Sequence, residues 1–318
     1  MKTSVYLDHA ATTRLHEKAL DAMLTHLGDQ HGNPSGQYAL GRQAARALDD
    51  GRHSVAEILA CKPAEVVFTG PGTESINSAI KGVALAQQRA GLGNHIVTTT
   101  VEHHAVLHSC EWLEKFGFEV TYVPVDSYGV ASPDDVARAV NERTVLVSVM
   151  LANNEIGTIE PVAEIASAVR ERAKSLKRRV PVHTDAVQGA NSLGLRVDDL
   201  GVDLLSLSAH KCGGPKGAGV LYMRRGTPFL SLMSGGGQER QRRAGTENVA
   251  SIAGTAVALT EAQANRDSYT RACRALTTRL VEGALKTIPR AKLTGHPEMR
   301  LPNNAHFSFE GAESDVML

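Results

Sequence analysis

This 318-residue sequence lacks both a charge imbalance and a long apolar run. Its 34 basic residues balance 34 acidic ones, so bulk charge favours neither nucleic acid nor an anionic membrane as a partner. No stretch approaches the roughly 20 apolar residues of a membrane-spanning helix. The first eight residues already include Lys2 and Asp8, and they contain no apolar run of the kind that forms the core of a signal peptide. We therefore expect a cytoplasmic protein without a membrane segment.

Cysteine is scarce and widely spaced. The four cysteines are Cys61, Cys110, Cys212 and Cys273. None forms a C-x-x-C pair, which argues against a disulfide framework and against a thiolate zinc site. A reducing compartment fits this pattern best.

Several motifs of metal and nucleotide sites are missing as well. His104 and His108 are four apart on a predicted helix, but no H-E-x-x-H motif and no suitably spaced carboxylate completes a zinc site. The glycines at 213–217 lack the order of a P-loop, and those at 235–237 lack the spacing of a dinucleotide fingerprint. We therefore predict no bound metal and no ATP or NAD.

Short apolar, β-branched runs alternate with helix-length segments along most of the chain. Strands are predicted at 66–69, 96–99, 120–123, 145–149, 180–183, 204–207 and 219–223. Helices are predicted near 73–90, 105–116, 132–141 and 161–177. Strands without polar alternation, separated by helices, indicate a mainly parallel, seven-stranded sheet covered on both faces, hence an α/β fold.

A second, smaller lobe is predicted at the C-terminal side. A helical pattern runs from about 246 to 287, and a strand-like stretch follows at 305–309. We assign residues 16–250 to a large α/β domain and residues 1–15 and 251–318 to a smaller α+β lobe. Residues 313–318 have the pattern of the opening of a helix, with Ser314 or Asp315 as its cap. We therefore expect the smaller lobe to be incomplete, through truncation at the C-terminus.

Lys211 stands in the sharpest local pattern of the sequence. A strand at 204–207 runs into a polar, glycine-rich turn that carries His210 and Lys211. A lysine there can form an imine with an aldehyde cofactor if burial or nearby cations lower its pKa. The alternative is a surface lysine in a turn.

Three other segments support a cofactor site. Asp185 follows a short strand, where a carboxylate can pair with a protonated pyridine nitrogen. The segment 70–75 joins a strand to a helix, so its backbone N–H groups, with Thr73 and Ser75, can face a phosphate; a plain capped turn is the alternative. His103 follows another strand, where an imidazole can stack on a planar ring or move a proton.

Two further loops carry polar groups. The amides at 153–157 can bond a ring oxygen, although a simple turn also explains Asn and Gly there. Arg240, Arg242 and Arg243 follow the glycines at 235–237 without interleaved aromatic residues. This loop fits an anion-binding or interface segment better than a nucleic-acid site; a solvated loop is the alternative.

Taken together, these motifs resemble the NifS-like and IscS-like cysteine desulfurases, pyridoxal-phosphate enzymes of the class-V aminotransferase family with an aminotransferase-like fold. The matching stretches occur in the family's order and span almost the whole chain: YLDHAATT at 6–13, GNPS at 32–35, TES at 73–75, EHHAVL at 102–107, NNEIG at 153–157, HTDAVQ at 183–188, SAHK at 208–211 and GGGQERQRRAGT at 235–246.

The resemblance implies a role for each residue of a cofactor site. Lys211 would bond pyridoxal phosphate covalently, Asp185 would bond its pyridine nitrogen, and His103 would stack on its ring. The remaining implied contacts are Asn154 and Gln188 at the phenolic oxygen, Gly72, Thr73, Ser208 and His210 at the phosphate, Thr246 at the phosphate of a partner subunit, and Asn33 at the substrate carboxylate. A homodimer with shared sites is implied.

The resemblance also implies the reaction. Such enzymes convert L-cysteine to L-alanine and keep the sulfur as a persulfide for an acceptor, such as an iron–sulfur scaffold or a thiolation pathway. The family's nucleophilic cysteine and its carboxylate-binding arginine come after residue 318, so we expect this form to bind the cofactor without turning over. Cys212 should point away from the site as a small packed thiol. The alternatives are a related lyase, such as a selenocysteine lyase, and a catalytically inactive cofactor-binding dimer.

Overall fold

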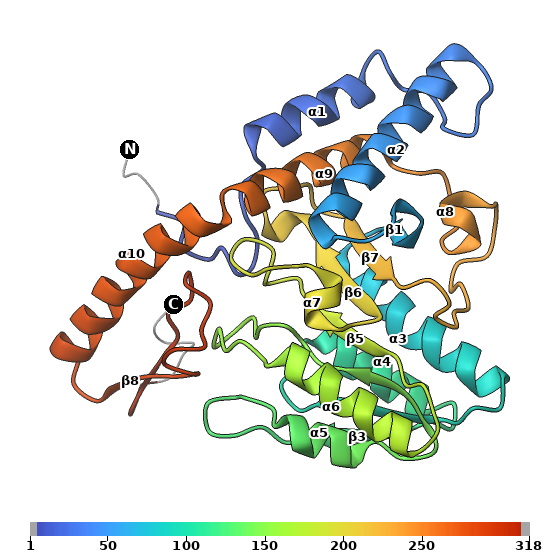
Figure 1. Ribbon diagram of the computed structural model, residues 1–318. Coiled ribbons are helices and arrows are strands. Elements are labelled where there is room, and N and C mark those ends of the chain that lie inside the picture. The colour runs from blue at the N-terminus through green and yellow to red at the C-terminus, as the bar shows by residue number, and fades with distance from the viewer. Residues whose placement is uncertain (1–4, 313–318) are drawn as a thin grey trace.

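The computed structural model, which describes residues 5–312, contains one large twisted sheet. Its seven strands lie in the order β1-β7-β6-β5-β4-β2-β3 (Figure 1). The bounds are β1 Val66–Thr69, β2 His95–Thr99, β3 Glu119–Val123, β4 Thr144–Ser148, β5 Val182–Asp185, β6 Leu204–Ser208 and β7 Gly219–Met223. Only β7 runs antiparallel to its neighbours, so the prediction of a mainly parallel α/β sheet is confirmed.

Helices cover both faces of this sheet (Figure 1). Helices α3 (Gly72–Arg89) and α4 (His104–Glu114) pack on one face, in an apolar cluster that includes Ile80 and Leu113. The other face is covered by α2 Ala39–Leu59, α5 Pro133–Ala139, α6 Val162–Ser175 and α9 Val249–Ala264. Because both faces are buried, the strands need apolar residues at successive positions, which explains their uninterrupted apolar runs.

The strands and helices expected from the sequence are found within a few residues of their predicted bounds, with three exceptions. Asp185 is the last residue of β5 and does not follow it. The helical pattern at 246–287 forms two helices, α9 and α10 (Arg266–Thr287), because the chain leaves the helix at Asn265. The pattern did not reveal α1 (Glu17–Leu27), which buries only Ala19, or α2, in which arginines and glycines interrupt the apolar stripe.

The C-terminal segments differ in how they pack. Helix α9 is buried against α1 and α2, whereas α10 extends away from the sheet and has no buried residue (Figure 1). Near the end of α10, β8 (Ala291–Leu293) pairs with β9 (Phe307–Phe309). The division of the chain at residue 250 stays a prediction. The helix start expected at 313–318 lies outside the described residues.

The remaining short elements are η1 (Pro63–Glu65), α7 (Val197–Leu200), η2 (Ala209–Lys211) and α8 (Gln238–Gln241). A buried ion pair holds α8 against the sheet. The two terminal guanidinium nitrogens of Arg52, Nη1 and Nη2, each lie 2.8 Å from a carboxylate oxygen of Glu239, which also accepts a hydrogen bond from the backbone N–H of Phe68. This pairing offsets the cost of burying the two charges and anchors the loop of Arg240, Arg242 and Arg243.

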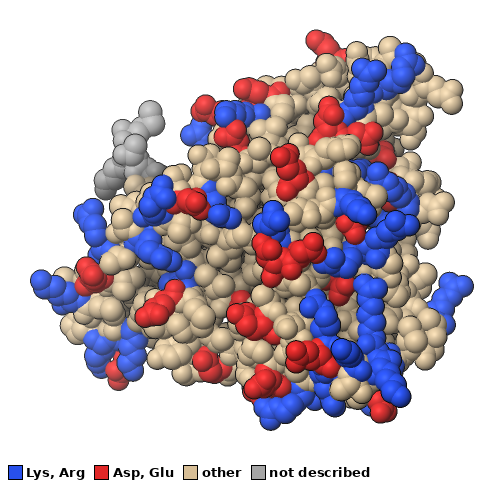
Figure 2. Space-filling model, viewed as in Figure 1, with Lys and Arg blue, Asp and Glu red and all other residues tan. Residues whose placement is uncertain are grey.

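The charged surface agrees with the balanced composition. Lys and Arg side chains alternate with Asp and Glu over the face in view, without a broad field of one sign (Figure 2). Within residues 5–312, no helix combines the length and apolarity that crossing a bilayer requires. The same residues hold no cluster of three or more His, Cys, Asp or Glu side chains that suits a metal ion.

Candidate active site

A cavity of about 440 Å³ opens at the carboxyl ends of the parallel strands. It is lined by the N-terminus of α3, the turn between β2 and α4, the segments that follow β4 and β5, the η2 turn after β6, and the N-terminal segment around Ala10. This is the edge at which ligands bind in open α/β sheets. Its volume falls in the range of roughly 300 to 1,000 Å³ that is typical of small-molecule and cofactor sites.

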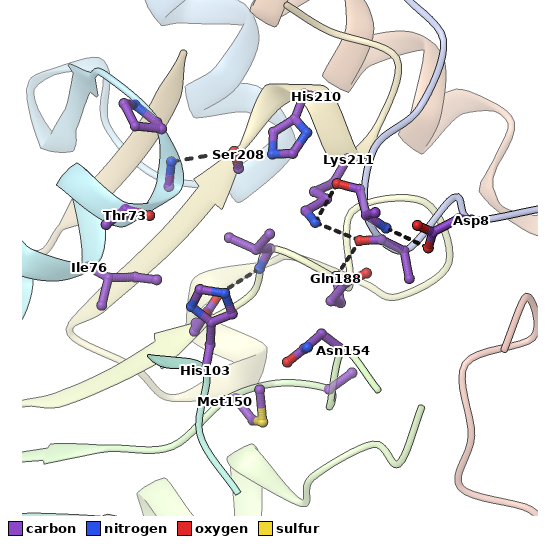
Figure 3. Close-up of a pocket in the computed structure, with 17 residues that line it drawn as sticks. Asp8, Thr73, Ile76, His103, Met150, Asn154, Gln188, Ser208, His210 and Lys211 are labelled. Atoms are coloured by element: carbon purple, nitrogen blue, oxygen red, sulfur yellow. Dashed lines mark hydrogen bonds between the residues drawn. The ribbon is translucent and has the colours of Figure 1, made fainter. Parts of the chain in front are cut away.

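Lys211 lies in η2, directly beyond β6, and reaches into this cavity (Figure 3). Its Nζ donates hydrogen bonds to the backbone oxygens of Ala10, at 2.5 Å, and Ala11, at 2.8 Å. Burial lowers the pKa of Lys211, while the carboxylates of Asp8 and Asp185 raise it and limit the effect. A half-buried lysine of this kind supplies an uncharged amine more readily than a surface lysine does.

Asp185 ends β5 on the floor of the cavity and is 5% exposed. Its Oδ1 accepts a hydrogen bond of 3.0 Å from the backbone N–H of Val187. Burial raises the pKa of Asp185 to about 6, although the Val187 bond and Lys211 pull it down. A cation placed against this carboxyl would favour its ionised form, so Asp185 fits the protonated nitrogen of a pyridine ring.

The N-terminus of α3 and the end of β6 form a cradle for an anion. The Gly72 backbone N–H donates to Ser208 Oγ at 3.3 Å, and a Cβ at Gly72 would come within 2.9 Å of Ser208 Cβ, so only glycine allows this approach. Thr73 and His210 line the same end of the cavity, where the helix dipole favours negative charge. These residues fit a phosphate group.

Ser75 does not contribute to this cradle, so that part of the prediction is wrong. Its side chain is fully buried, and its Oγ bonds Ser206 Oγ at 2.8 Å and the backbone oxygen of Val220 at 2.9 Å. One helical turn from the N-terminus of α3, the serine faces the sheet and not the cavity. Its hydroxyl fastens the helix to β6 and β7.

His103 is the N-cap of α4, and this role fixes its ring. Its Nδ1 accepts a hydrogen bond of 3.0 Å from the backbone N–H of Ala105. Partial burial lowers the pKa of His103, and Lys211 lowers it further. The neutral ring therefore carries its proton on Nε2. His103 and Asn154 lie together on one wall of the cavity (Figure 3).

The N-terminal segment around Ala10 closes one side of the cavity, but no motif in the sequence predicted a role for it. Gln188 Nε2 donates to the backbone oxygen of Ala10 at 3.0 Å, the same oxygen that Lys211 contacts. Thr13 is tied to His210 through its backbone N–H, at 2.9 Å, and its hydroxyl, at 2.8 Å. The only sequence signal for this segment was its place in the family resemblance.

Apolar side chains complete the walls. Ile76, Met150, Ala152 and Val187 line the cavity and were not predicted, because their types are those of ordinary core residues. They give a planar ring an apolar surface to lie against.

Asn33 and Thr246 do not line this cavity. Asn33 lies between α1 and α2, where its Oδ1 accepts a hydrogen bond of 2.9 Å from the backbone N–H of Ser35. Thr246 follows α8 and borders a separate small hollow beside Arg243 and Gly70. The implied roles of Asn33 at a substrate carboxylate and of Thr246 at a partner's phosphate stay predictions.

Cys212 also lies outside the cavity, as expected, although the backbone there is a turn and not extended. Its side chain is 6% exposed in the apolar core, and burial raises the pKa of its thiol to about 12. Cys212→Ala should leave pyridoxal-phosphate affinity unchanged and lower the free energy of unfolding by about 1 kcal/mol, through loss of one packed atom. Spectroscopic titration and urea unfolding measure both. A loss of affinity without a loss of stability would contradict the assignment of Cys212 to the core.

Comparison with known proteins settles the family. The aminotransferase class-V family matches residues 5–318, nearly the entire chain. The chain belongs to this family. Its cavity, with Lys211 beyond β6 and Asp185 at the end of β5, lies at the edge of the sheet where ligands bind in open α/β folds.

Similar proteins narrow the position within this family. The chain is 46% identical to cysteine desulfurase IscS of Methanosarcina thermophila, over 99% of the chain and 76% of that protein. It is also 46% identical to cysteine desulfurase IscS of Dictyoglomus turgidum, over the whole chain and 79% of that protein. A solved NifS-like protein superposes with a TM-score of 0.94 at 38% identity, over 99% of this chain and 84% of that chain. This class-V chain is thus a homologue of the NifS-like and IscS-like cysteine desulfurases.

Proposed function

We propose that this chain binds pyridoxal 5'-phosphate and serves in a cysteine desulfurase, which converts L-cysteine to L-alanine and passes the sulfur on as a persulfide. One observation carries the proposal: an amine, a buried carboxyl, an imidazole and an anion cradle line one cavity, at Lys211, Asp185, His103 and Gly72. The homology to IscS proteins supports the substrate. When bound, the cofactor would supply an electron sink for the carbanion at the substrate's α carbon.

Each residue has a distinct task in this proposal. Lys211 would supply the amine that bonds the cofactor's aldehyde, and its amine can accept a proton from the substrate, because burial lowers its pKa. The charge of Asp185 would favour a proton on the pyridine nitrogen. His103 would contact the ring, and Asn154 and Gln188 would bond the phenolic oxygen. Gly72, Thr73, Ser208 and His210 hold the phosphate through hydrogen bonds and the α3 dipole.

Sulfur transfer needs a thiolate that reaches the substrate. None of the four cysteines lines the cavity: Cys110 and Cys212 are buried in the core, and Cys61 and Cys273 lie elsewhere on the chain. With cysteine supplied to this 318-residue form, we therefore expect substrate binding without catalytic sulfide.

We further propose a cytoplasmic homodimer that donates sulfur to an acceptor such as an iron–sulfur scaffold. All four cysteines are free, which suits a reducing compartment. Thr246, which is outside its own chain's cavity, would serve the phosphate of the partner subunit.

The test is a visible absorption spectrum of the purified protein before and after borohydride, with mass spectrometry of its peptides. We expect a yellow protein, and a reduced cofactor adduct on Lys211 alone. A colourless protein that cannot be reconstituted with pyridoxal phosphate would refute cofactor binding. Brisk formation of alanine and sulfide by this form would instead refute our assignment of the four cysteines.

A further inference from the structure

A buried glutamate stands directly beside His103 and has no part in the contacts described above. Glu102 is 5% exposed, and its Oε1 accepts hydrogen bonds from Thr99 Oγ1 at 2.9 Å and from the backbone N–H of Met150 at 2.8 Å. Thr99 ends β2, and Met150 lies just beyond the end of β4, the neighbouring strand. One carboxyl oxygen thus joins the carboxyl ends of two adjacent strands.

A second side chain, on the segment after β4, also links this segment to the turn after β2. Asn153, on the segment after β4, donates from Nδ2 to the backbone oxygen of Val101 at 3.0 Å. Its Oδ1 accepts from the backbone N–H groups of Glu155, at 2.9 Å, and Ile156, at 3.0 Å. The turn that carries His103 is therefore fastened to the segment that carries Met150 and Asn154, and all three line one wall of the cavity (Figure 3).

We propose that Glu102 is a positioning residue of the cofactor site, acting as a neutral carboxylic acid that sets the place of His103 relative to Asn154. The proposal rests on the proposed function, because it assigns these two residues to the cofactor. Glu102 does not line the cavity and acts only through its neighbours.

The hydrogen-bond pattern suits the acid better than the carboxylate. Both donors meet Oε1, whereas Oε2 is buried without a hydrogen-bond partner in the described part of the chain. A carboxylate with one bare, buried oxygen bears the desolvation cost of an unpaired charge, whereas the acid keeps Oε1 as an acceptor and leaves one neutral hydroxyl unpaired, which costs less. Glutamine has nearly the same shape, keeps the acceptor at Oε1 and places a neutral amide nitrogen where the acid has its neutral hydroxyl, so it should replace Glu102.

The surroundings of Glu102 add to this effect. Burial raises its pKa to about 8; the bonds from Met150 and Thr99 lower it, and Asp185 and Glu160 raise it. Asp185 faces Glu102 from β5, Glu160 from the segment before α6, and Cys110 from α4. None of these groups is a cation, so ionised Glu102 would stand unpaired beside the carboxylate that serves the cofactor.

The experiment measures the dissociation constant of pyridoxal phosphate for the full chain and for Glu102→Ala, Glu102→Gln and the control Glu160→Gln. Glu160 is 2% exposed, accepts one backbone bond from Ala131 and has a pKa raised by burial to about 7, but it lies outside the cavity. At pH 7, Glu102→Ala should raise the dissociation constant about tenfold, while Glu102→Gln and Glu160→Gln should change it less than about threefold.

A pH series separates positioning from a merely structural role. Above about pH 8, where Glu102 ionises, the affinity of the unaltered chain for pyridoxal phosphate should fall relative to that of Glu102→Gln, by about tenfold per pH unit at most. Titration of Lys211 affects both proteins equally and therefore cancels from the ratio of their affinities. Glu160→Gln keeps Glu102, so its affinity should also fall relative to Glu102→Gln; because the carboxylate of Glu160 raises the pKa of Glu102, the fall should begin at slightly lower pH. Urea unfolding tests the protonation of Glu102 independently of cofactor binding. Because the pKa of Glu102 is higher in the folded protein than the unfolded value of 4.5, the free energy of unfolding should fall as pH rises from 4.5 towards 8. The free energy of unfolding of Glu102→Gln should fall less over the same range.

Three outcomes would overturn the proposal. They are a Glu102→Ala variant that is less stable yet binds the cofactor normally, a Glu102→Gln variant that behaves like Glu102→Ala, and a flat affinity ratio across pH 8. If Glu102→Ala does not fold, the pH profile of Glu102→Gln still decides. Failure of the unaltered chain to bind pyridoxal phosphate would instead refute the proposed function.

Discussion

Lys211→Ala should abolish covalent attachment of pyridoxal phosphate and lower any cofactor-dependent turnover of cysteine by about a thousandfold or more. The side chain is the only lysine among those that line the cavity of the described chain. Its Nζ is positioned by the backbone oxygens of Ala10 and Ala11, and no other amine can replace it there. The residual cavity should still hold the phosphate end of the cofactor through Gly72 and Ser208, so binding should weaken without vanishing.

Borohydride reduction followed by peptide mass spectrometry measures the attachment directly. Lys216→Ala is the matched control, because Lys216 lies on the same loop, is exposed and is close enough to affect the pKa of His210. The control should keep the adduct at full yield. A reduced adduct on another lysine in the Lys211→Ala protein would contradict the assignment.

Most of the sheet could be predicted because its strands are buried on both faces. Runs such as 145–149 and 219–223 have no polar alternation, which few other structures tolerate in a globular chain. The break at Asn265 was missed because the residues on both sides favour a helix, and a single Asn, although it can end one helix and begin the next, is a weak signal within a long helical pattern. Helix α10 contains no buried residue, so the distribution of its apolar residues did not indicate which side of the helix would pack against the rest of the protein.

The polar lining of the cavity was predictable where residues lie at or just beyond the ends of strands. Asp185, His103 and Lys211 all lie at the carboxyl ends of parallel strands, and the topology brings such positions together. Contacts that depend on side-chain direction were not predictable. Ser75 is two residues from Thr73 on α3, and the helical rotation between them turns its hydroxyl to the sheet. The closing segment at Ala10 arrives from about 200 residues away in sequence, a separation that local patterns do not encode.

Asp185→Asn should slow carbanion chemistry at the substrate's α carbon by about a hundredfold or more, while changing cofactor affinity much less. Asparagine keeps the shape and the Oδ1 acceptor for the Val187 N–H, but it cannot hold a proton on the pyridine nitrogen by its charge. The exchange of the α-proton of L-alanine in deuterated water, followed by NMR, measures this step without any sulfur chemistry. It therefore applies to a chain whose cysteines all lie outside the cavity.

The same substitution should have the opposite effect on stability, which separates a functional carboxyl from a structural one. Burial raises the pKa of Asp185 to about 6 from 3.8, so the ligand-free protein loses stability as pH rises through this window. Asp185→Asn escapes that loss and should be at least as stable at pH 7, with the advantage disappearing below about pH 4. Asp203→Asn, at the opposite end of the sheet, should leave exchange unchanged. Slow exchange together with lower stability at pH 7 would mean that Asp185 supports the fold and not the cofactor.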